Sequence, residues 1–171
     1  MDPTPLIDRI ATLVPGAAIE AAASIDVPAV YVPAGQLVDV CLALRDQAQF
    51  DLLLEITAVD YLPRQPRYEV VYHLVSTSAL TRARLKVKVP AGETVPTVQG
   101  VWPAAGWPER EVWDLFGIVF DGHPDLRRIL TPDDWEGHPL RKDHPVQVRK
   151  TAQTYEPLEV TEQEFRANIE R

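Results

Sequence analysis

Apolar positions in the first fifty residues recur at helical spacing in two places. The stripe from Leu6 to Val14, after Thr4-Pro5 and before Pro15-Gly16, predicts a capped amphipathic helix. A second stripe predicts a helix over residues 35–49 that covers a sheet. Cys41 lies on this second stripe, so we expect a buried small hydrophobic side chain there and not a nucleophile.

Short extended runs predict the sheet that these helices cover. The runs are Ala18–Ala23, Ala29–Val32, Leu52–Tyr61, Tyr68–Val75 and Leu80–Val89. The last run alternates apolar residues with a basic row, Arg82, Arg84, Lys86 and Lys88, which is typical of an antiparallel strand with one solvated face. The basic row is either such a solvated face or a docking surface for an acidic partner or nucleic acid. The expected fold class is α+β, with a mixed or antiparallel sheet covered by helices.

The pattern changes after Pro90. A helix is predicted to begin at Trp107-Pro108 and to end at Gly117, with Ile118–Phe120 leaving in extended form. From His123 onward, prolines at positions 124, 132, 139 and 145 leave no room for a helix of more than two turns. Thr131–Gly137 is predicted to form one turn.

This proline-spaced segment carries charges and apolar anchors but little that it could bury against itself. Such a composition is typical of an extended arm that lies along another protein. We therefore expect three parts: an α+β domain over residues 1–89, a helix-containing connection over 90–121, and a Pro/Gly-rich extended arm over 122–171 that docks on a partner subunit.

Composition sharpens this division. The chain has 171 residues and 16 prolines, and eight of these prolines fall between positions 90 and 145 with all four tryptophans. The same segment has ten acidic and five basic residues, within a chain whose formal net charge is −8. This charge argues against a general affinity for nucleic acid.

Several function classes are excluded by what the sequence lacks. One cysteine permits neither an intrachain disulfide nor an iron–sulfur cluster held by this chain alone. No transmembrane span is expected, because the longest uncharged stretch, Thr94–Pro108, contains three prolines and two glycines. No G-x-G dinucleotide-binding fingerprint occurs.

The remaining chemical alternative is a small metal-dependent enzyme. His123, His138 and His144, with Asp125 and Asp143, contain the side-chain types that bind metals or exchange protons. They occur without the fixed two-ligand spacing of a helical H-E-x-x-H pair, and imidazoles that hydrogen-bond to loop backbone are commoner than metal ligands. Glu109, Glu111 and Asp114 could likewise form a catalytic carboxylate pair, although helix-end electrostatics and interface ion pairs explain them with fewer assumptions.

Two long runs resemble a known family. EREVWDLFGI at residues 109–118 and GHPDLRRILTPDDWEGHPLRKDHP at residues 122–145 resemble the 30 kDa subunit family of respiratory complex I, the NADH–quinone oxidoreductase, whose bacterial member is the subunit designated C. Weaker similarity runs through residues 50–61 and 68–73. Pro108 and His144 depart from the residue types usual in that family.

The resemblance implies a non-catalytic structural subunit of the peripheral arm of a proton-translocating complex, on the cytoplasmic side of the plasma membrane. It implies packing against the large subunit that helps form the quinone site. It also implies that this chain holds no cofactor, while FMN, iron–sulfur clusters and quinone belong to partner subunits. The residues that we expect at the partner interface are Glu109, Arg110, Glu111, Asp114, Phe116, Leu126, Arg127, Arg128, Trp135, Arg141, Lys142 and Asp143.

Overall fold

A computed structural model describes residues 2–145 of the chain. The elements are α1 (Thr4–Leu13), β1 (Glu20–Ala21), β2 (Ala29–Tyr31), the 3-10 helix η1 (Ala34–Gln36), α2 (Leu37–Ala48), β3 (Leu52–Asp60), β4 (Tyr68–Ser76), β5 (Thr81–Val89), β6 (Val95–Pro96), the 3-10 helix η2 (Pro103–Ala105), α3 (Gly106–Phe116) and β7 (Phe120–Asp121). No helix in this part of the chain has the length and apolar character needed to cross a membrane.

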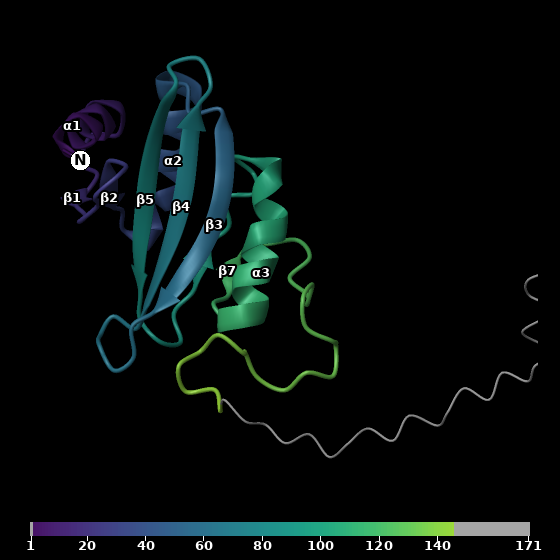
Figure 1. Ribbon diagram of the computed structural model, residues 1–171. Helices are drawn as coiled ribbons and strands as arrows, with labels where there is room; N and C mark the ends of the chain where they lie inside the picture. The colour runs from purple at the N-terminus through teal and green to yellow at the C-terminus, as the bar shows by residue number, and fades with distance from the viewer. Residues whose placement is uncertain (1, 146–171) are drawn as a thin grey trace, which may run out of the picture.

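The strands form one main sheet in the order β1-β2-β5-β4-β3. β2 pairs in parallel with β5, and the other three pairings in the sheet are antiparallel. β6 and β7 form a small parallel pair of their own. The predicted α+β class with a mixed sheet covered by helices is confirmed. In Figure 1, α2 lies behind the main sheet and α3 lies beside the edge strand β3.

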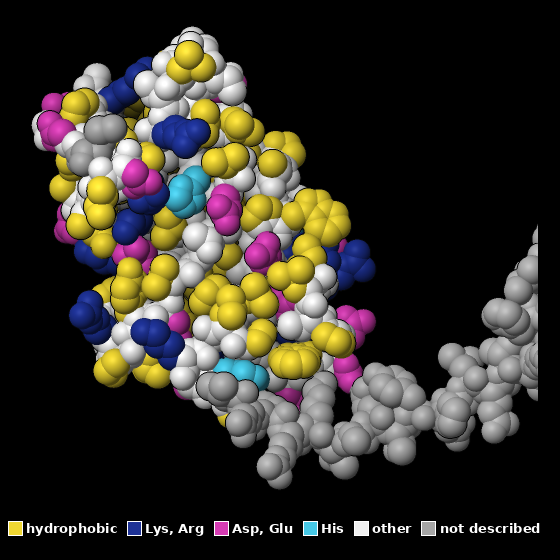
Figure 2. Space-filling model, viewed as in Figure 1, with side chains coloured by type: hydrophobic (Ala, Val, Ile, Leu, Met, Phe, Trp, Pro, Cys, Tyr) yellow, Lys and Arg dark blue, Asp and Glu magenta, His cyan; other side chains and the backbone are white. Residues whose placement is uncertain are grey.

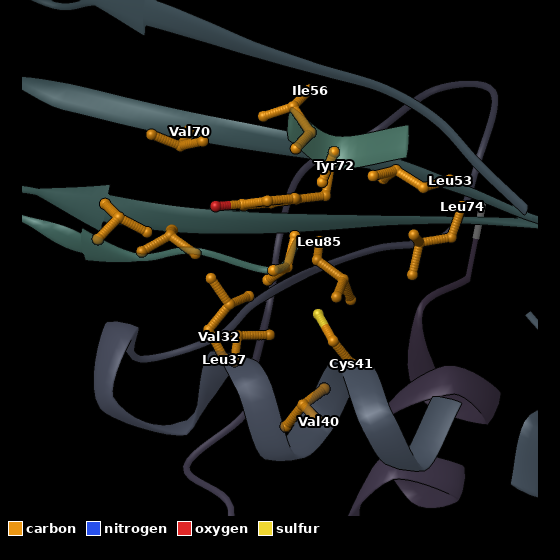
Figure 3. Close-up of a cluster of buried hydrophobic side chains, with 14 of the residues drawn as sticks. Val32, Leu37, Val40, Cys41, Leu53, Ile56, Val70, Tyr72, Leu74 and Leu85 are labelled. Atoms are coloured by element: carbon orange, nitrogen blue, oxygen red, sulfur yellow. The ribbon is translucent and has the colours of Figure 1, made fainter. Parts of the chain in front are cut away.

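The core lies between the sheet and α2. The alternation predicted for β5 is observed, because Ala83, Leu85, Val87 and Val89 are all buried. Figure 3 shows side chains of α2, among them Cys41, facing Leu85 and Tyr72 on the sheet. The exposed fraction of Cys41 is 0%, and this burial raises the pKa of its thiol well above the ordinary value. Cys41 is a core residue, as predicted.

The core extends beyond residue 89. Val95, Val98, Trp102 and Phe120 belong to the same buried cluster as the sheet and α2. The indole Nε1 of Trp102 also donates to the carbonyl oxygen of Phe50 at 3.2 Å, which joins this segment to the start of β3. The boundary expected after residue 89 therefore does not separate two packed units. Residues 90–121 complete the domain that was predicted to end before them.

The other face of the main sheet is turned toward the viewer in Figure 1, and no helix of the described chain covers it there. Most of the basic row on this face is neutralised by the chain itself. The ion pairs are Arg84 with Asp26, Lys86 with Glu69 and Lys88 with Glu20, at N–O distances of 3.4, 2.9 and 3.1 Å. These pairs favour the solvated-face interpretation of the row over a continuous basic docking surface.

Candidate functional site

The part of the chain after β7 returns to the domain from which it came. We use "the arm" for residues 122–145; the rest of the predicted arm, 146–171, lies outside the described residues. Figure 1 shows the arm passing beside α3 and then crossing below the main sheet. Within the arm no helix or strand is present, as the proline spacing predicts, and residues 131–137 contain a turn closed by Trp135 N–H on the carbonyl of Pro132 at 3.0 Å.

The first anchor of the arm is Asp114, whose side chain is fully buried near the end of α3. Its Oδ2 accepts the backbone N–H groups of Ile129, Leu130 and Thr131 at 3.1, 2.9 and 2.9 Å. Its Oδ1 accepts from the Thr131 hydroxyl at 2.5 Å and from Arg128 Nη1 at 2.6 Å. One carboxylate therefore satisfies donors from four consecutive arm residues.

Two opposing effects act on the pKa of Asp114. Burial alone would raise this pKa, but the hydrogen bonds from the hydroxyl and N–H of Thr131 and the N–H groups of Ile129 and Leu130 outweigh it. The pKa of Asp114 is therefore held well below its usual range. The group stays ionised, as an anion that holds a loop in place.

Arg128 extends the first anchor into the arm. Beyond Asp114, its guanidinium donates to the carbonyls of Trp135 at 2.8 Å and Gly137 at 3.1 Å. Its side chain is 14% exposed. A second arginine, Arg110 of α3, donates to the carbonyls of Arg127 and Arg128, both at 3.1 Å. The two arginines thus fix the backbone of the arm.

A second anchor holds the far end of the arm. Arg67, at the start of β4, is 6% exposed and forms paired hydrogen bonds to two carboxylates. Its Nε and Nη2 bind the two oxygens of Asp60 at 3.0 and 2.8 Å, and its Nη1 and Nη2 bind Asp143 at 3.0 and 2.8 Å. Asp60 also accepts the N–H of Lys142 at 2.9 Å. Hydrogen bonds from Arg67 hold the pKa values of both carboxyl groups below their usual range.

Glu109 is a third buried carboxyl group, and it holds the segment around β6. Its Oε1 accepts the N–H of Val98 at 2.7 Å, and its Oε2 accepts the Thr97 hydroxyl at 2.5 Å. His123 Nε2 lies 3.9 Å from Oε2. Burial raises the pKa of Glu109, although these two hydrogen bonds oppose the increase. Its environment thus acts on the pKa in the opposite direction from that of Asp114.

These shifts predict how stability depends on pH. The unfolded carboxyl groups of Asp60 and Asp114 titrate near 3.8, and their folded pKa values are lower. Their stabilisation is complete above the unfolded pKa and is lost as pH falls through the folded pKa. We expect the free energy of unfolding, measured by urea titration, to fall below about pH 4. Asp114→Asn should flatten that fall, and an unchanged acid limb in this variant would contradict the assignment.

Glu109 contributes a pH dependence of stability with the opposite sign. Its folded pKa is raised above the unfolded value of 4.5, so its contribution is present below 4.5 and is lost as pH rises through the raised pKa. The same urea titration on Glu109→Gln should therefore lose this decline on the alkaline side and keep the acid limb.

Two of the three histidines predicted as alternative metal ligands, His123 and His138, bind loop backbone. His123 Nδ1 accepts the N–H of Asp125 at 3.1 Å, so its Nε2 carries the proton and donates to the carbonyl of Gly106 at 3.1 Å. His138 Nδ1 donates to the carbonyl of Asp114 at 2.9 Å. Residues 2–145 contain no group of three side chains arranged to hold a metal ion. The geometry therefore gives the metal-enzyme alternative no support.

Gly117 allows the ring of His138 to lie against the end of α3. It ends the helix with a φ of +75°, as predicted for a terminating glycine. A Cβ at this position would lie 2.5 Å from Cδ2 of His138, so glycine is needed for both backbone conformation and space. The ring of His144, one of the two family departures, stacks on Trp135 with 6.5 Å between ring centroids.

Comparison with known proteins identifies the family to which this fold and arm belong. Residues 30–150 match the family described as "Respiratory-chain NADH dehydrogenase, 30 Kd subunit". The chain belongs to this family. The match includes most of the main sheet and the whole arm, so the resemblance is not confined to the two runs in which it is most evident.

Individual relatives agree with the assignment to the 30 kDa subunit family. The NADH-quinone oxidoreductase subunit designated C of Roseiflexus sp. (strain RS-1) is 44% identical over 158 residues, which cover 91% of this chain and 91% of that protein. The corresponding subunit of Geobacter metallireducens is 54% identical over 113 residues, 65% of this chain and 70% of that protein. The relationship extends over most of the length of both proteins.

A solved structure shares the fold. A chain in the structure of the membrane-bound sulfane sulfur reductase, an archaeal respiratory membrane complex, superposes with a TM-score of 0.71 at 32% identity. The match covers 84% of this chain and 85% of that chain.

The structure corrects the expected interface of this family member at three positions. Glu109 and Asp114 are 0% exposed and bind this chain's own backbone, and Phe116 belongs to the core. Asp114 is occupied by the arm, Glu109 by the segment around β6, and Phe116 is buried in the core, so none of the three is exposed to a partner.

The other expected interface residues remain a prediction. Glu111, Arg127, Lys142 and Asp143 are exposed. Arg110, Leu126, Arg128, Trp135 and Arg141 are half-buried within the arm and beside it.

Sequence reasoning missed the second anchor. Asp60 and Arg67 flank the loop that contains Pro63 and Pro66, and neither was expected to bind the arm. The sequence feature that could have indicated this anchor is a carboxylate and an arginine at the two ends of a short loop between predicted strands. No sequence pattern around Thr97 indicated that its hydroxyl would bind Glu109.

Proposed function

We propose that this chain is a non-catalytic structural subunit of the peripheral arm of a proton-translocating NADH–quinone oxidoreductase. It takes up its place on the cytoplasmic side of the membrane. In this proposal the outer face of residues 122–145 packs against the large subunit that helps form the quinone site. FMN, iron–sulfur clusters and quinone belong to the partner subunits.

The observation that carries the proposal is the two-sided character of the arm. Its inner side is bound to α3 and Arg67 by the two anchors, while Leu130, Leu140 and the Arg127 side chain are 58%, 52% and 73% exposed on its outer side. Large apolar side chains on a backbone held in place by buried ion pairs form a pre-organised contact surface, which reduces the entropy lost on association.

Two further observations support a structural role. The carboxylates and imidazoles that would serve catalysis hold loops in place: Asp60, Glu109, Asp114, His123 and His138 all bind backbone groups. The same fold also occurs in a complex named for sulfane sulfur reduction and not for quinone reduction. A fold that occurs in complexes with different reactions is consistent with a subunit that carries none of the reacting groups.

The test compares two exposed leucines. Leu130→Asp changes the outer side of the arm, and Leu80→Asp makes the same change at the β4–β5 turn, where Leu80 is 88% exposed. Each full-length variant is expressed in the native host, and the detergent-solubilised complex is purified through another subunit. Quantitative mass spectrometry then gives the ratio of this chain to the other subunits.

Leu130→Asp is expected to lower that ratio about tenfold, because a carboxylate in an apolar contact costs at least about 1.4 kcal/mol. Leu80→Asp should leave the ratio unchanged. Quinone reduction should fall with the ratio, while the reaction of the flavin with NADH and ferricyanide stays constant per flavin. Equal ratios for the two variants would contradict the proposed contact.

A further inference from the structure

A groove lies at the end of the open sheet face where the β3–β4 loop curls toward β5. It consists of two adjoining clefts of about 240 and 190 Å³ that share Tyr31 and Lys88. The larger cleft is also lined by Tyr61, Arg64, Pro66 and Glu69. We call the two together the tyrosine groove. No residue of the arm lines it, so it is separate from the contact surface proposed above.

The walls of the tyrosine groove are held in a fixed arrangement. The Tyr31 hydroxyl donates to Glu69 at 2.9 Å, and Glu69 also pairs with Lys86 at 2.9 Å. The Lys88 ammonium lies 4.0 Å from the centre of the Tyr31 ring and 3.1 Å from Glu20. Burial and the neighbouring Glu69 raise the pKa of Tyr31 to about 12, so its hydroxyl stays a donor at neutral pH. These contacts hold the Tyr31 side chain in place in the wall of the groove.

The groove has an unpaired positive charge at its mouth. Among residues 2–145, the basic side chains with no ion pair to an acidic group are Arg9, Arg64, Arg82 and Lys142. One of these, Arg64, lines the larger cleft. Arg64 is on the β3–β4 loop, and the backbone of Lys142 is bound to Asp60, which begins that loop. Figure 2 shows Lys and Arg side chains standing out at the lower end of this face.

This free positive charge contrasts with the formal net charge of the whole chain, which is −8. Tyrosine and arginine are also the residue types most enriched at the energetic centres of protein interfaces. A groove lined by three tyrosines, two prolines and a free guanidinium is suited to a peptide that brings carboxylates. Glu20 and Glu69 also stand in the walls, but each is paired with a lysine, so the charge left free in the lining is that of Arg64.

We propose that the tyrosine groove binds an extended acidic segment of a partner subunit. Arg64 pairs with a carboxylate of that segment, and the rings of Tyr31 and Tyr61 pack against its side-chain stems. The inference uses the proposed function only in placing the chain within a complex. It adds a second contact, away from the outer side of the arm.

The test is a charge reversal with a matched control. Arg64→Glu and Arg82→Glu change the charge equally at exposed positions, but Arg82 lies at the opposite end of β5, beside the β4–β5 turn. Both variants are made in the full-length chain and followed in the solubilised native complex by the subunit ratio at increasing salt concentration. Thermal unfolding of the isolated chains should match wild type, because neither side chain has an ion-pair partner among residues 2–145.

Arg64→Glu is expected to release this chain from the complex at lower salt and to reduce its ratio about tenfold at physiological ionic strength. Arg82→Glu should behave as wild type. A photo-crosslinker at Gln65 should label a segment of another subunit that contains Asp or Glu, and reversal of that acidic residue should restore the ratio in Arg64→Glu.

Equal retention of the two variants, or a crosslink only to a segment without acidic residues or to this chain itself, would overturn the inference. Loss of the chain in Leu130→Asp together with normal retention of Arg64→Glu would reject the groove contact and leave the proposed function standing.

Discussion

Asp114→Ala is expected to lower the free energy of unfolding by about 3–5 kcal/mol, the usual result of removing one partner of a buried ion pair. The variant leaves the Arg128 guanidinium, which is only 14% exposed, without its carboxylate. It also removes the acceptor for the N–H groups of Ile129, Leu130 and Thr131. The measurement is urea unfolding of the full-length chain at neutral pH.

Glu111→Ala is the matched control for this prediction. Glu111 lies on the same helix, three residues before Asp114, and is exposed. Its replacement should change the free energy of unfolding by less than about 0.5 kcal/mol, as for most surface positions. If the two variants were equally stable, Asp114 would not be the anchor that its hydrogen bonds indicate.

Arg67→Met is expected to cost a similar amount, about 3–5 kcal/mol. The variant preserves much of the apolar stem but leaves Asp60, 4% exposed, as a buried carboxylate without a cation. Asp143, in contrast, is half exposed and can be solvated, so Asp143→Asn should cost less than about 1 kcal/mol. Urea unfolding of both variants measures the difference between a buried and an exposed partner of the same arginine.

A double-mutant cycle isolates the Asp60–Arg67 interaction. Asp60→Asn in the Arg67→Met background removes the stranded charge and should recover part of the lost stability. Additive effects of the two substitutions would show that these side chains do not act on one another, against the bonds at 2.8 and 3.0 Å between them.

The regular elements could be predicted from local pattern. The alternation in β5 and the stripe that includes Cys41 report burial directly, because each repeats with the period of its element. Gly117 likewise marks the end of α3 by its own backbone conformation. In these places the sequence contains the physical cause of the structure within a few residues.

The anchors could not be predicted in this way. A charged residue near a helix end usually faces solvent or a partner, and Asp114 is buried only because residues 128–131 return to it. That return has no periodicity. Prolines also interrupt the apolar periodicity around Val95 and Trp102. The domain was therefore predicted to end at residue 89, although both side chains belong to its core. The sequence located the arm and its charges but not the surface against which they pack.

Burial of the anchors changes how the arm is understood. From the sequence alone, the arm is predicted to form one side of an interface in which a partner neutralises its charges. In the structure Asp114 and Arg67 neutralise two of these charges, Arg128 and Asp143, while Leu130 and Leu140 remain exposed. These two pairs thus fix the backbone of the arm, and its exposed leucines are the side chains that we propose for the partner contact.

Hydrogen exchange in the isolated, full-length chain tests whether the arm is anchored before assembly. The amides of Ile129, Leu130 and Thr131 donate to Asp114, and we expect them to be protected to the same order as the amides of α3. This protection should disappear in Asp114→Ala while that of β4 remains. Exchange of these three amides at the rate of an unstructured peptide in the wild-type chain would contradict the anchored arm.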